Sequence, residues 1–292
     1  MAVDLLQEKI RKTKNPSVLE LSISAQEIPA HLLEEEGSTG KAYARFCREL
    51  MEQLQGILPA VWISFTAFAF LGHDGLYQLS ETLKVAARLG YYVILDTPEL
   101  LSPASAQMAA QQLLGEDSLY PCDALVIPVF LGSDVIKPFL PFCKNGKKDI
   151  FVVTRTANKS APEIQDLLAG SRMVHMAAAD HVNRYGADTA GKFGYTRVGI
   201  LAAASAAESL KSLRSKYPRM FLLIDGYDYP NANAKNCSHA FDKFGHGAVV
   251  CGGTGITCAW KDAESDGRDY LDHAKSAAER MKKNLTRYVT IL

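Results

Sequence analysis

Three aspartates lie where a parallel-strand enzyme would carry out chemistry. Asp96 ends the apolar run Y-Y-V-I-L-D, and Asp225 and Asp228 lie in D-G-Y-D directly after the run M-F-L-L-I. Carboxylates at strand ends could perform acid–base catalysis or hold a metal ion. Each also has a purely structural interpretation, because a strand-end Asp often caps the next helix or turn and acids in loops are commonly solvated. Both interpretations stay open at this point.

A glycine-rich turn follows the last apolar run. G-G-T-G comprises Gly252, Gly253, Thr254 and Gly255. Successive backbone amides and a hydroxyl at the start of a helix could hold a small anion such as phosphate. The alternative is that the glycines only permit a tight strand-to-helix turn.

Apolar residues occupy other strand ends. Trp62 lies in A-V-W-I-S-F, and Pro98 and Leu101 lie in D-T-P-E-L-L, the segment that begins at Asp96. We expect Trp62 to fill space at the end of a barrel, as a large aromatic side chain does. Glu99 in the same loop adds to the charge of the three aspartates, so this end should repel an anionic ligand.

The elements that position these residues alternate regularly along the chain. Eight apolar or β-branched runs begin at Ser17, Ala60, Tyr91, Asp123, Asp149, Arg197, Met220 and Gly247. Amphipathic segments lie between them, including 39–54, 74–88 and 266–283. Eight β-then-α units predict an α/β protein with a single (β/α)8 TIM barrel, in which catalytic residues lie at the C-terminal strand ends. We expect one domain over residues 1–292, with an N-terminal extension of about residues 1–16.

Composition excludes several classes of function. The 292 residues contain 32 basic and 32 acidic side chains, so no net charge favours nucleic acid. No apolar run is long enough to span a membrane, and the charged N-terminus has no signal-peptide h-region. The six cysteines are scattered without a C-x-x-C, which favours reduced thiols in the cytoplasm.

Metal-ligating patterns are absent from the sequence. Cys251 and Cys258 lack the spacing of metal ligands, and His175 and His181 are six residues apart, which does not place them on one helix face. We therefore expect no metal and no cofactor.

Four segments resemble the orotidine 5'-phosphate decarboxylase family in its longer bacterial form. They are A-F-A-F-L-G-H-D-G-L (67–76), L-G-S-D-V-I-K-P-F-L (131–140), V-V-T-R-T-A-N-K-S-A-P-E-I-Q-D-L (152–167) and G-I-T-C-A-W-K-D-A-E-S-D-G-R-D-Y (255–270). The resemblance runs over nearly the whole chain. It implies a dimeric barrel that converts orotidine monophosphate to uridine monophosphate without a metal or cofactor.

The family's catalytic tetrad is largely replaced. The resemblance implies a lysine at the second strand end, which falls on Trp62, and a D-x-K-x-x-D motif after the third. Asp96 is the only tetrad member kept, because the motif's lysine is Pro98 and its second acid is Leu101.

Other positions that the family uses also differ. The first-strand Asp falls on Ser22, the phosphate-binding glutamine on Pro230 and the phosphate-binding arginine on Thr254.

The end of the fifth strand, by contrast, keeps the family's pattern. Arg155, Thr156 and Asn158 match its R-T-S-N, and they are candidates either for ligand binding or for a structural role in the barrel rim.

Three hypotheses follow. The first is a decarboxylase-dead binding or regulatory paralogue that forms a homodimer or pairs with a true decarboxylase subunit, and that binds a small anion or an altered nucleotide. The second is an enzyme of altered substrate that uses Asp96, Asp225 and Asp228. The third, a working decarboxylase with relocated residues, is the least favoured, because a carbanion needs a nearby cation.

Overall fold

The computed structural model describes residues 2–98 and 100–292. Eight parallel strands form a closed barrel in the order β1-β10-β9-β8-β5-β4-β3-β2. They are β1 (Ser17–Leu21), β2 (Ala60–Ile63), β3 (Tyr92–Asp96), β4 (Ala124–Ile127), β5 (Asp149–Val153), β8 (Thr196–Ala203), β9 (Met220–Asp225) and β10 (Ala248–Gly252). The prediction of a (β/α)8 barrel is confirmed, and each predicted run supplies one barrel strand.

The strands are apolar because both of their faces are covered. Every residue of β2, β4, β8 and β10 is buried. Side chains that point inward pack in the barrel, and those that point outward pack under the helices. The sheet closes where Ser17 of β1 pairs with Val250 of β10 and Val18 pairs with Ala60 of β2.

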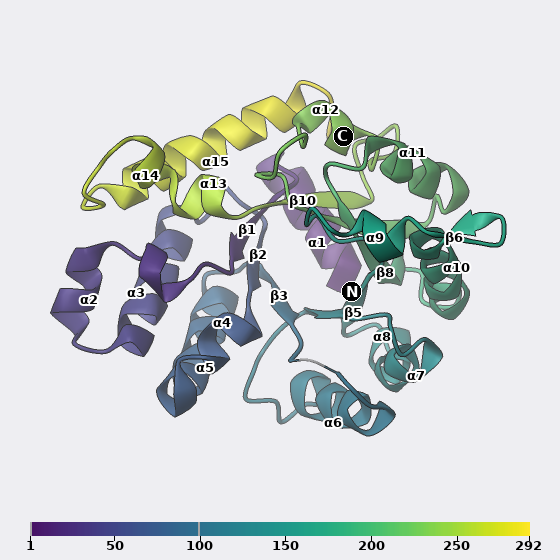
Figure 1. Cartoon of the computed structure of the whole chain (residues 1–292), viewed down its shortest axis with the longest axis horizontal. Helices are drawn as coiled ribbons and strands as arrows, with labels where there is room; N and C mark the ends of the chain where they lie inside the picture. The colour runs from purple at the N-terminus through teal and green to yellow at the C-terminus, as the bar shows by residue number, and fades with distance from the viewer. Residues whose placement is uncertain (1, 99) are drawn as a thin grey trace.

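Helices form a ring around the barrel (Figure 1). The longer ones are α3 (Thr39–Gln53), α5 (Gly72–Arg88), α6 (Pro103–Leu114), α10 (Val174–Gly186), α11 (Ala207–Lys216) and α15 (Tyr270–Thr286). Shorter ones are α2 (Ala30–Glu36), α4 (Phe65–Ala69), α7 (Ser133–Ile136), α8 (Leu140–Lys144), α9 (Pro162–Gln165), α12 (Ala234–Ser238), α13 (Thr254–Thr257) and α14 (Ala259–Asp262). None of the described helices combines the length and apolar character that a membrane crossing requires.

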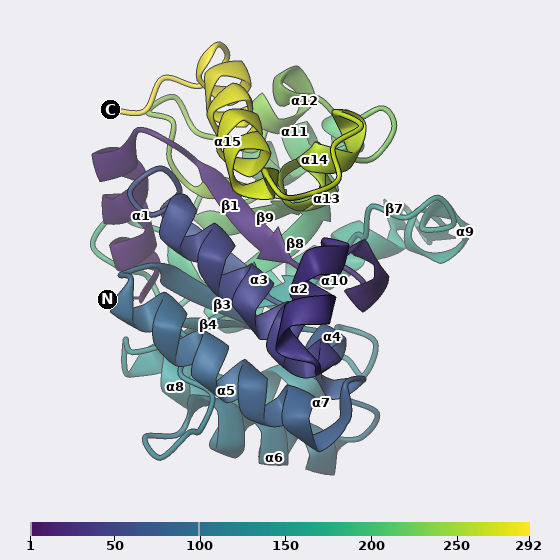
Figure 2. The same ribbon diagram turned by 90° about the vertical axis from the view of Figure 1, so that its left-hand side faces the viewer.

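A short excursion interrupts the alternation between β5 and β8. Strands β6 (Leu168–Ala169) and β7 (Arg172–Met173) pair antiparallel outside the barrel. Figure 2 shows this segment and α9 projecting from the side opposite to α1. The excursion therefore stands at the end of the barrel to which the strands point.

Helix α1 (Ala2–Thr13) lies against the other end of the barrel. Its Asp4 pairs with the buried Arg197 of β8, with Oδ2 and Nη2 3.1 Å apart. Arg197 Nη1 also lies 3.7 Å from Oδ1 of Asp149 on β5, and Tyr92 Oη donates to Asp149 Oδ2 at 2.5 Å. One guanidinium thus lies against two buried carboxyl groups, and its charge offsets only part of the desolvation that raises the pKa of Asp149 to about 8.

Replacing Arg197 by methionine should strongly destabilise the barrel. The change removes the cation but leaves the buried carboxyl groups of Asp4 and Asp149, so the free energy of unfolding should fall by about 3–5 kcal/mol. Urea unfolding measures it, with Arg219→Met, a change at an exposed arginine, as the matched control that should stay within about 0.5 kcal/mol. Equal midpoints for the two variants would contradict the buried-ion argument.

Candidate functional site

Two adjoining cavities open where the C-terminal strand ends converge, and both are lined by Asp225. The apolar cavity, of about 290 Å³, is lined by Trp62, Asp96, Thr97, Pro98, Val126, Ile127, Pro128, Val153, Thr156, Leu201 and Asp225. The acidic cavity, of about 250 Å³, is lined by Glu20, Ser22, Asp225, Gly226, Tyr227, Asp228, Tyr229, Gly253 and Thr254. Together they form the barrel mouth, where the fold places catalytic sites.

Glu20 of β1 is a mouth residue that sequence reasoning missed. It is the register neighbour of Trp62 on β2, and Ser22 Oγ donates to its Oε1 at 2.5 Å. Burial, followed by the charge of Asp225, raises the pKa of Glu20 to about 7. An acid within the apolar run S-V-L-E-L-S-I was the available signal, because Glu20 and Ser22 alternate onto the same face of the strand.

Asp96 both caps a helix and lines the apolar cavity. Its carboxylate accepts hydrogen bonds from Ser64 Oγ, at 2.9 Å, and from the amide of Phe65, the first residue of α4. Burial raises its pKa to about 6 in spite of these bonds. Both interpretations therefore apply. The oxygens of Asp96 bind the start of α4, and the residue also lines the apolar cavity.

Asp228 occupies the glycine-rich turn. Its Oδ2 accepts from the Gly253 amide at 2.8 Å, and a Cβ atom on Gly255 would lie 2.3 Å from its Oδ1. Burial raises the pKa of Asp228, while backbone hydrogen bonds from Gly253 and Gly255 oppose the rise. The Gly253 amide, which we considered for binding a small anion, therefore already binds the carboxylate of Asp228.

Asp225 and Gly252 are the last residues of β9 and β10. Asp225 ends β9 and faces both cavities, and burial raises its pKa while the Gly226 amide opposes the rise. Gly252 ends β10, where an added Cβ would lie 2.7 Å from the side chains of Ile256 and Met281. Close packing therefore explains this glycine.

The positions to which the resemblance assigns the tetrad lie at the apolar cavity or beside it. Trp62 is 8% exposed, and its Nε1 has no hydrogen-bond partner among the described residues. Pro98 lines the same cavity, whereas Leu101 is 76% exposed on the rim. Glu99, which we expected to add charge here, lies outside the described residues.

The mouth contains acids without cations. Neither lining includes a lysine, arginine or histidine among the residues that the structure describes. In the same part of the chain, no group of three or more His, Cys, Asp or Glu side chains is arranged to hold a metal ion. The carboxylates therefore present negative charge that no basic side chain in either lining offsets.

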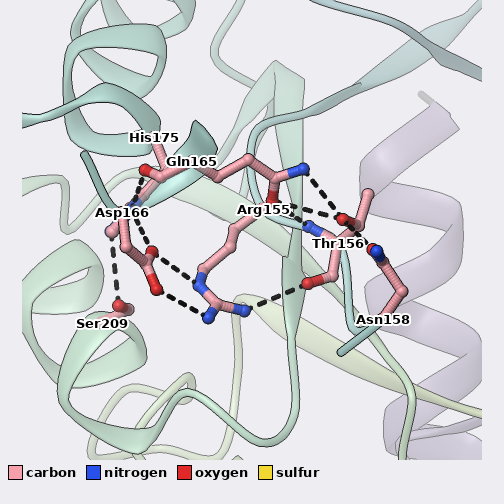
Figure 3. Close-up of polar contacts among 7 residues, drawn as sticks. All are labelled: Arg155, Thr156, Asn158, Gln165, Asp166, His175 and Ser209. Atoms are coloured by element: carbon pink, nitrogen blue, oxygen red, sulfur yellow. Dashed lines mark hydrogen bonds and ion pairs between the residues drawn. The ribbon is translucent and has the colours of Figure 1, made fainter. Parts of the chain in front are cut away.

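Arg155 binds Asp166 and the Thr156 carbonyl (Figure 3), and it lines neither mouth cavity. Its Nε and Nη2 bind Asp166 Oδ1 and Oδ2 at 3.0 and 2.8 Å, and its Nη1 donates to the Thr156 carbonyl at 3.0 Å. Thr156 Oγ1 in turn donates to Asn158 Oδ1 at 2.5 Å. This bidentate pairing fixes the excursion after β5, which supports the structural interpretation for Arg155, whereas Thr156 also lines the apolar cavity.

His175 continues this network, with a geometry that resembles a Ser–His–Asp triad. Its Nδ1 lies 3.1 Å from Asp166 Oδ1, and its Nε2 lies 3.3 Å from Ser209 Oγ (Figure 3). His175 is buried, and neither it nor Ser209 lines a mouth cavity. The set links α10 to α11, and Asp166 is already neutralised by Arg155.

Arg155 and Lys159 line a third cavity, which we call the outer cavity. This space of about 470 Å³ is lined by Arg155, Ala157, Asn158, Lys159, Pro162, Ser205, Tyr229, Pro230 and Asn231. Tyr229 lines both this and the acidic cavity and so forms part of the wall between them. A Cβ on Gly226, whose φ is +76°, would lie 2.2 Å from Ala157 Cβ and 2.8 Å from Tyr229 Cδ2, so the wall is tightly packed.

Comparison with known sequences gives a consistent result. No protein-family model matches the chain. A protein named orotidine 5'-phosphate decarboxylase from Petrotoga mobilis is 26% identical over 288 residues, 98% of each chain. One of the same name from Rhodopirellula baltica is 29% identical over 256 residues, 85% of each chain.

Solved structures share the fold at lower identity. Plasmodium berghei orotidine 5'-monophosphate decarboxylase superposes with a TM-score of 0.79 at 14% identity, covering 98% of both chains. The Leishmania donovani OMP decarboxylase gives a TM-score of 0.72 at 21% identity, covering 97% of this chain and 99% of that one.

Replacing Glu20 by glutamine should stabilise the protein more at alkaline than at acid pH. The folded pKa of about 7 lies above the unfolded value of about 4.3, so ionisation increasingly opposes folding as the pH rises through this window. The gain over wild type should be about 2–3 kcal/mol larger at pH 8 than at pH 5. Urea unfolding at both pH values measures it.

The matched control is Glu52→Gln, at an exposed position near the end of α3. Its effect should be the same at both pH values. A pH-independent difference for Glu20→Gln would show that the carboxyl group is ordinarily solvated.

Proposed function

We propose, on the premise that this chain is homologous over nearly its full length to the orotidine 5'-phosphate decarboxylases and has their barrel fold, that it is a decarboxylase-dead binding or regulatory protein. The observation that carries the proposal is a barrel mouth lined by carboxylates and Trp62, with no basic side chain among the described residues of either lining. The family reaction develops a carbanion, which must be stabilised and protonated by a cationic group at the reacting carbon. Carboxylates alone would raise the energy of that carbanion.

Recognition of a nucleotide phosphate is opposed at the same place. The position of the family's arginine is Thr254, and Asp228 occupies the adjacent Gly253 amide. A phosphate would have to displace this carboxylate and then lie close to it. We therefore propose that uridine monophosphate binds weakly or not at all.

One observation favours a second candidate, an enzyme of altered substrate. Glu20 and Asp96 have pKa values raised to about 7 and about 6, in the range that suits a general acid or base at neutral pH. Asp225 and Asp228 stand beside Glu20 and would share this work. The third hypothesis would require Arg155 or Lys159, which line the outer cavity behind Tyr229.

Self-association through the rim is the second part of the proposal. Leu101 is 76% exposed, Phe70 86% and Phe130 90%, and they follow β3, β2 and β4 at the C-terminal face. Exposed apolar side chains that follow three neighbouring strands suit a protein interface. We propose that this face forms a homodimer, or pairs with an active decarboxylase subunit, in the cytoplasm.

The purified protein should show no orotidine monophosphate decarboxylation above background. Loss of a preorganised charge set lowers turnover by on the order of 10⁶-fold. A spectrophotometric assay, with the Petrotoga mobilis relative as positive control, measures it. The triple variant Trp62→Lys, Pro98→Lys, Leu101→Asp should not restore turnover, because the phosphate contacts are also missing. Robust turnover by wild-type protein free of host enzyme would refute the proposal.

The homodimer should depend on Leu101. Leu101→Asp places a charge in the apolar contact, so the dimer dissociation constant should rise by about tenfold or more. Sedimentation velocity over micromolar concentrations measures it, with Leu292→Asp at the exposed C-terminus as the matched control. A wild-type protein that stays monomeric, or a Leu101→Asp variant that dimerises equally well, would contradict this interface.

A further inference from the structure

The outer cavity is lined by cations and hydrogen-bond donors. Its walls come from the loops that follow β5, β8 and β9, three neighbouring strands of the barrel. The side chains in its lining that can donate a hydrogen bond are Arg155, Asn158, Lys159, Ser205, Tyr229 and Asn231. No aspartate or glutamate of the described chain lines it. The charge of this lining is therefore opposite to that of the barrel mouth, and it attracts anions.

Arg155 brings a buried cation with unused donors to this cavity. Only 8% of the residue is exposed. A guanidinium has five N–H bonds, and three of them are taken by the two oxygens of Asp166 and by the Thr156 carbonyl. The other two, one on Nη1 and one on Nη2, have no acceptor among the described residues. A carboxylate in the cavity can accept both, because its two oxygens match the fork of a guanidinium.

Lys159 adds a second cation, and the balance of charge selects a monoanion. Lys159 is exposed and forms no ion pair or hydrogen bond with the part of the chain that the structure describes. The hydrogen bonds from Arg155 hold the pKa of Asp166 below its ordinary value, so Asp166 is ionised and offsets the charge of Arg155. One positive charge, that of Lys159, is left. A single carboxylate balances it, whereas a phosphate dianion would keep one charge unbalanced.

The uncharged part of the lining suits a hydroxylated ligand. The hydroxyl groups of Ser205 and Tyr229 and the side-chain amide of Asn231 form no hydrogen bond with the described residues. The volume of about 470 Å³ is in the range of small-molecule sites. Hydroxyl groups of a ligand can both donate to and accept from such side chains.

We infer that the outer cavity binds a small hydroxylated monocarboxylate. Its carboxylate accepts the two unused N–H bonds of Arg155 and pairs with the ammonium group of Lys159. Its hydroxyl groups bond with Ser205, Tyr229 and Asn231. The inference goes beyond the proposed function, because the Tyr229 wall separates this site from the barrel mouth, and the site does not depend on whether the mouth is catalytic.

D-Glucuronate is a suitable probe, because D-glucose has the same ring without the carboxylate and D-glucose 6-phosphate carries a phosphate at the same end. Isothermal titration calorimetry of the full chain should give glucuronate a dissociation constant of roughly 0.1–1 mM. Glucose should bind at least about tenfold more weakly, because it forms no charge-assisted hydrogen bond. Glucose 6-phosphate should also bind more weakly than glucuronate. No binding of glucuronate, equal binding of glucose, or tighter binding of the phosphate would overturn the inference.

Variants locate the site. Lys159→Gln removes the cation that is not offset and should weaken glucuronate binding by about tenfold. Asn231→Gly removes the side-chain amide but accepts the backbone φ of +70°, and it should weaken binding severalfold. Lys283→Gln is the matched control, because Lys283 is an exposed lysine near the end of α15, outside the cavity lining, and it should leave binding unchanged.

The outcomes for this site and for the proposed function stay distinct. Lys159 is exposed, so Lys159→Gln should fold, and a glucuronate affinity that this change does not lower overturns the inference. Decarboxylation by the wild-type protein, or uridine monophosphate binding at low micromolar concentration, overturns the proposed function. An inactive protein that binds neither glucuronate nor uridine monophosphate overturns only the ligand assignment.

Discussion

Closure of eight parallel strands into one barrel is the constraint on which the other features depend. All strands run in the same direction, so their C-terminal ends meet around one hollow. The register fixes which side chains face inward, and it places Glu20 beside Trp62 and Asp96 beside Val126. The chemistry of this barrel is therefore decided by a few strand-end residues, and here those residues are acids and one indole.

The acids of the mouth are tolerated for different physical reasons. Asp96 is stabilised by the amides that open α4, and Asp228 by the Gly253 amide. Glu20 accepts a hydrogen bond from the hydroxyl of Ser22, but burial favours its protonated form, and its pKa is raised to about 7. Ionisation of the buried Glu20 therefore lowers the stability of the fold at neutral pH. Residues that lower stability in this way are typical of binding sites.

The sequence was sufficient for the architecture because the strand and helix patterns are local. The segment 74–88 predicted α5, which begins two residues earlier, at Gly72. The segment 266–283 predicted α15, which begins only at Tyr270, because Ser265 and Asp266 form turn contacts around Gly267 at φ +87°. The paired strands β6 and β7 were not expected, since two-residue strands have no periodicity to detect.

The site was less predictable because its contacts join distant segments. Asp228 and Gly253 are 25 residues apart, and Asp4 and Arg197 are 193 apart. No pattern along the chain reveals that the Asp228 carboxylate binds the Gly253 amide, or that the Asp4 carboxylate binds Arg197. Arg155 shows the same limit, because its motif matches the family while Asp166 determines where its guanidinium points.

The glycine turn after β10 shows how a barrel of this kind can reverse its preference for charge. Backbone amides at the start of a helix attract any anion within reach. Asp228 is part of the same chain, so its effective concentration at the Gly253 amide far exceeds that of a dissolved phosphate. Once its carboxylate is bound, the turn no longer attracts anions, and Asp225 and Glu20 beside it repel them. The fold needs no rearrangement to place Asp228 there, because one aspartate in a loop is enough to make this turn one wall of an acidic cavity.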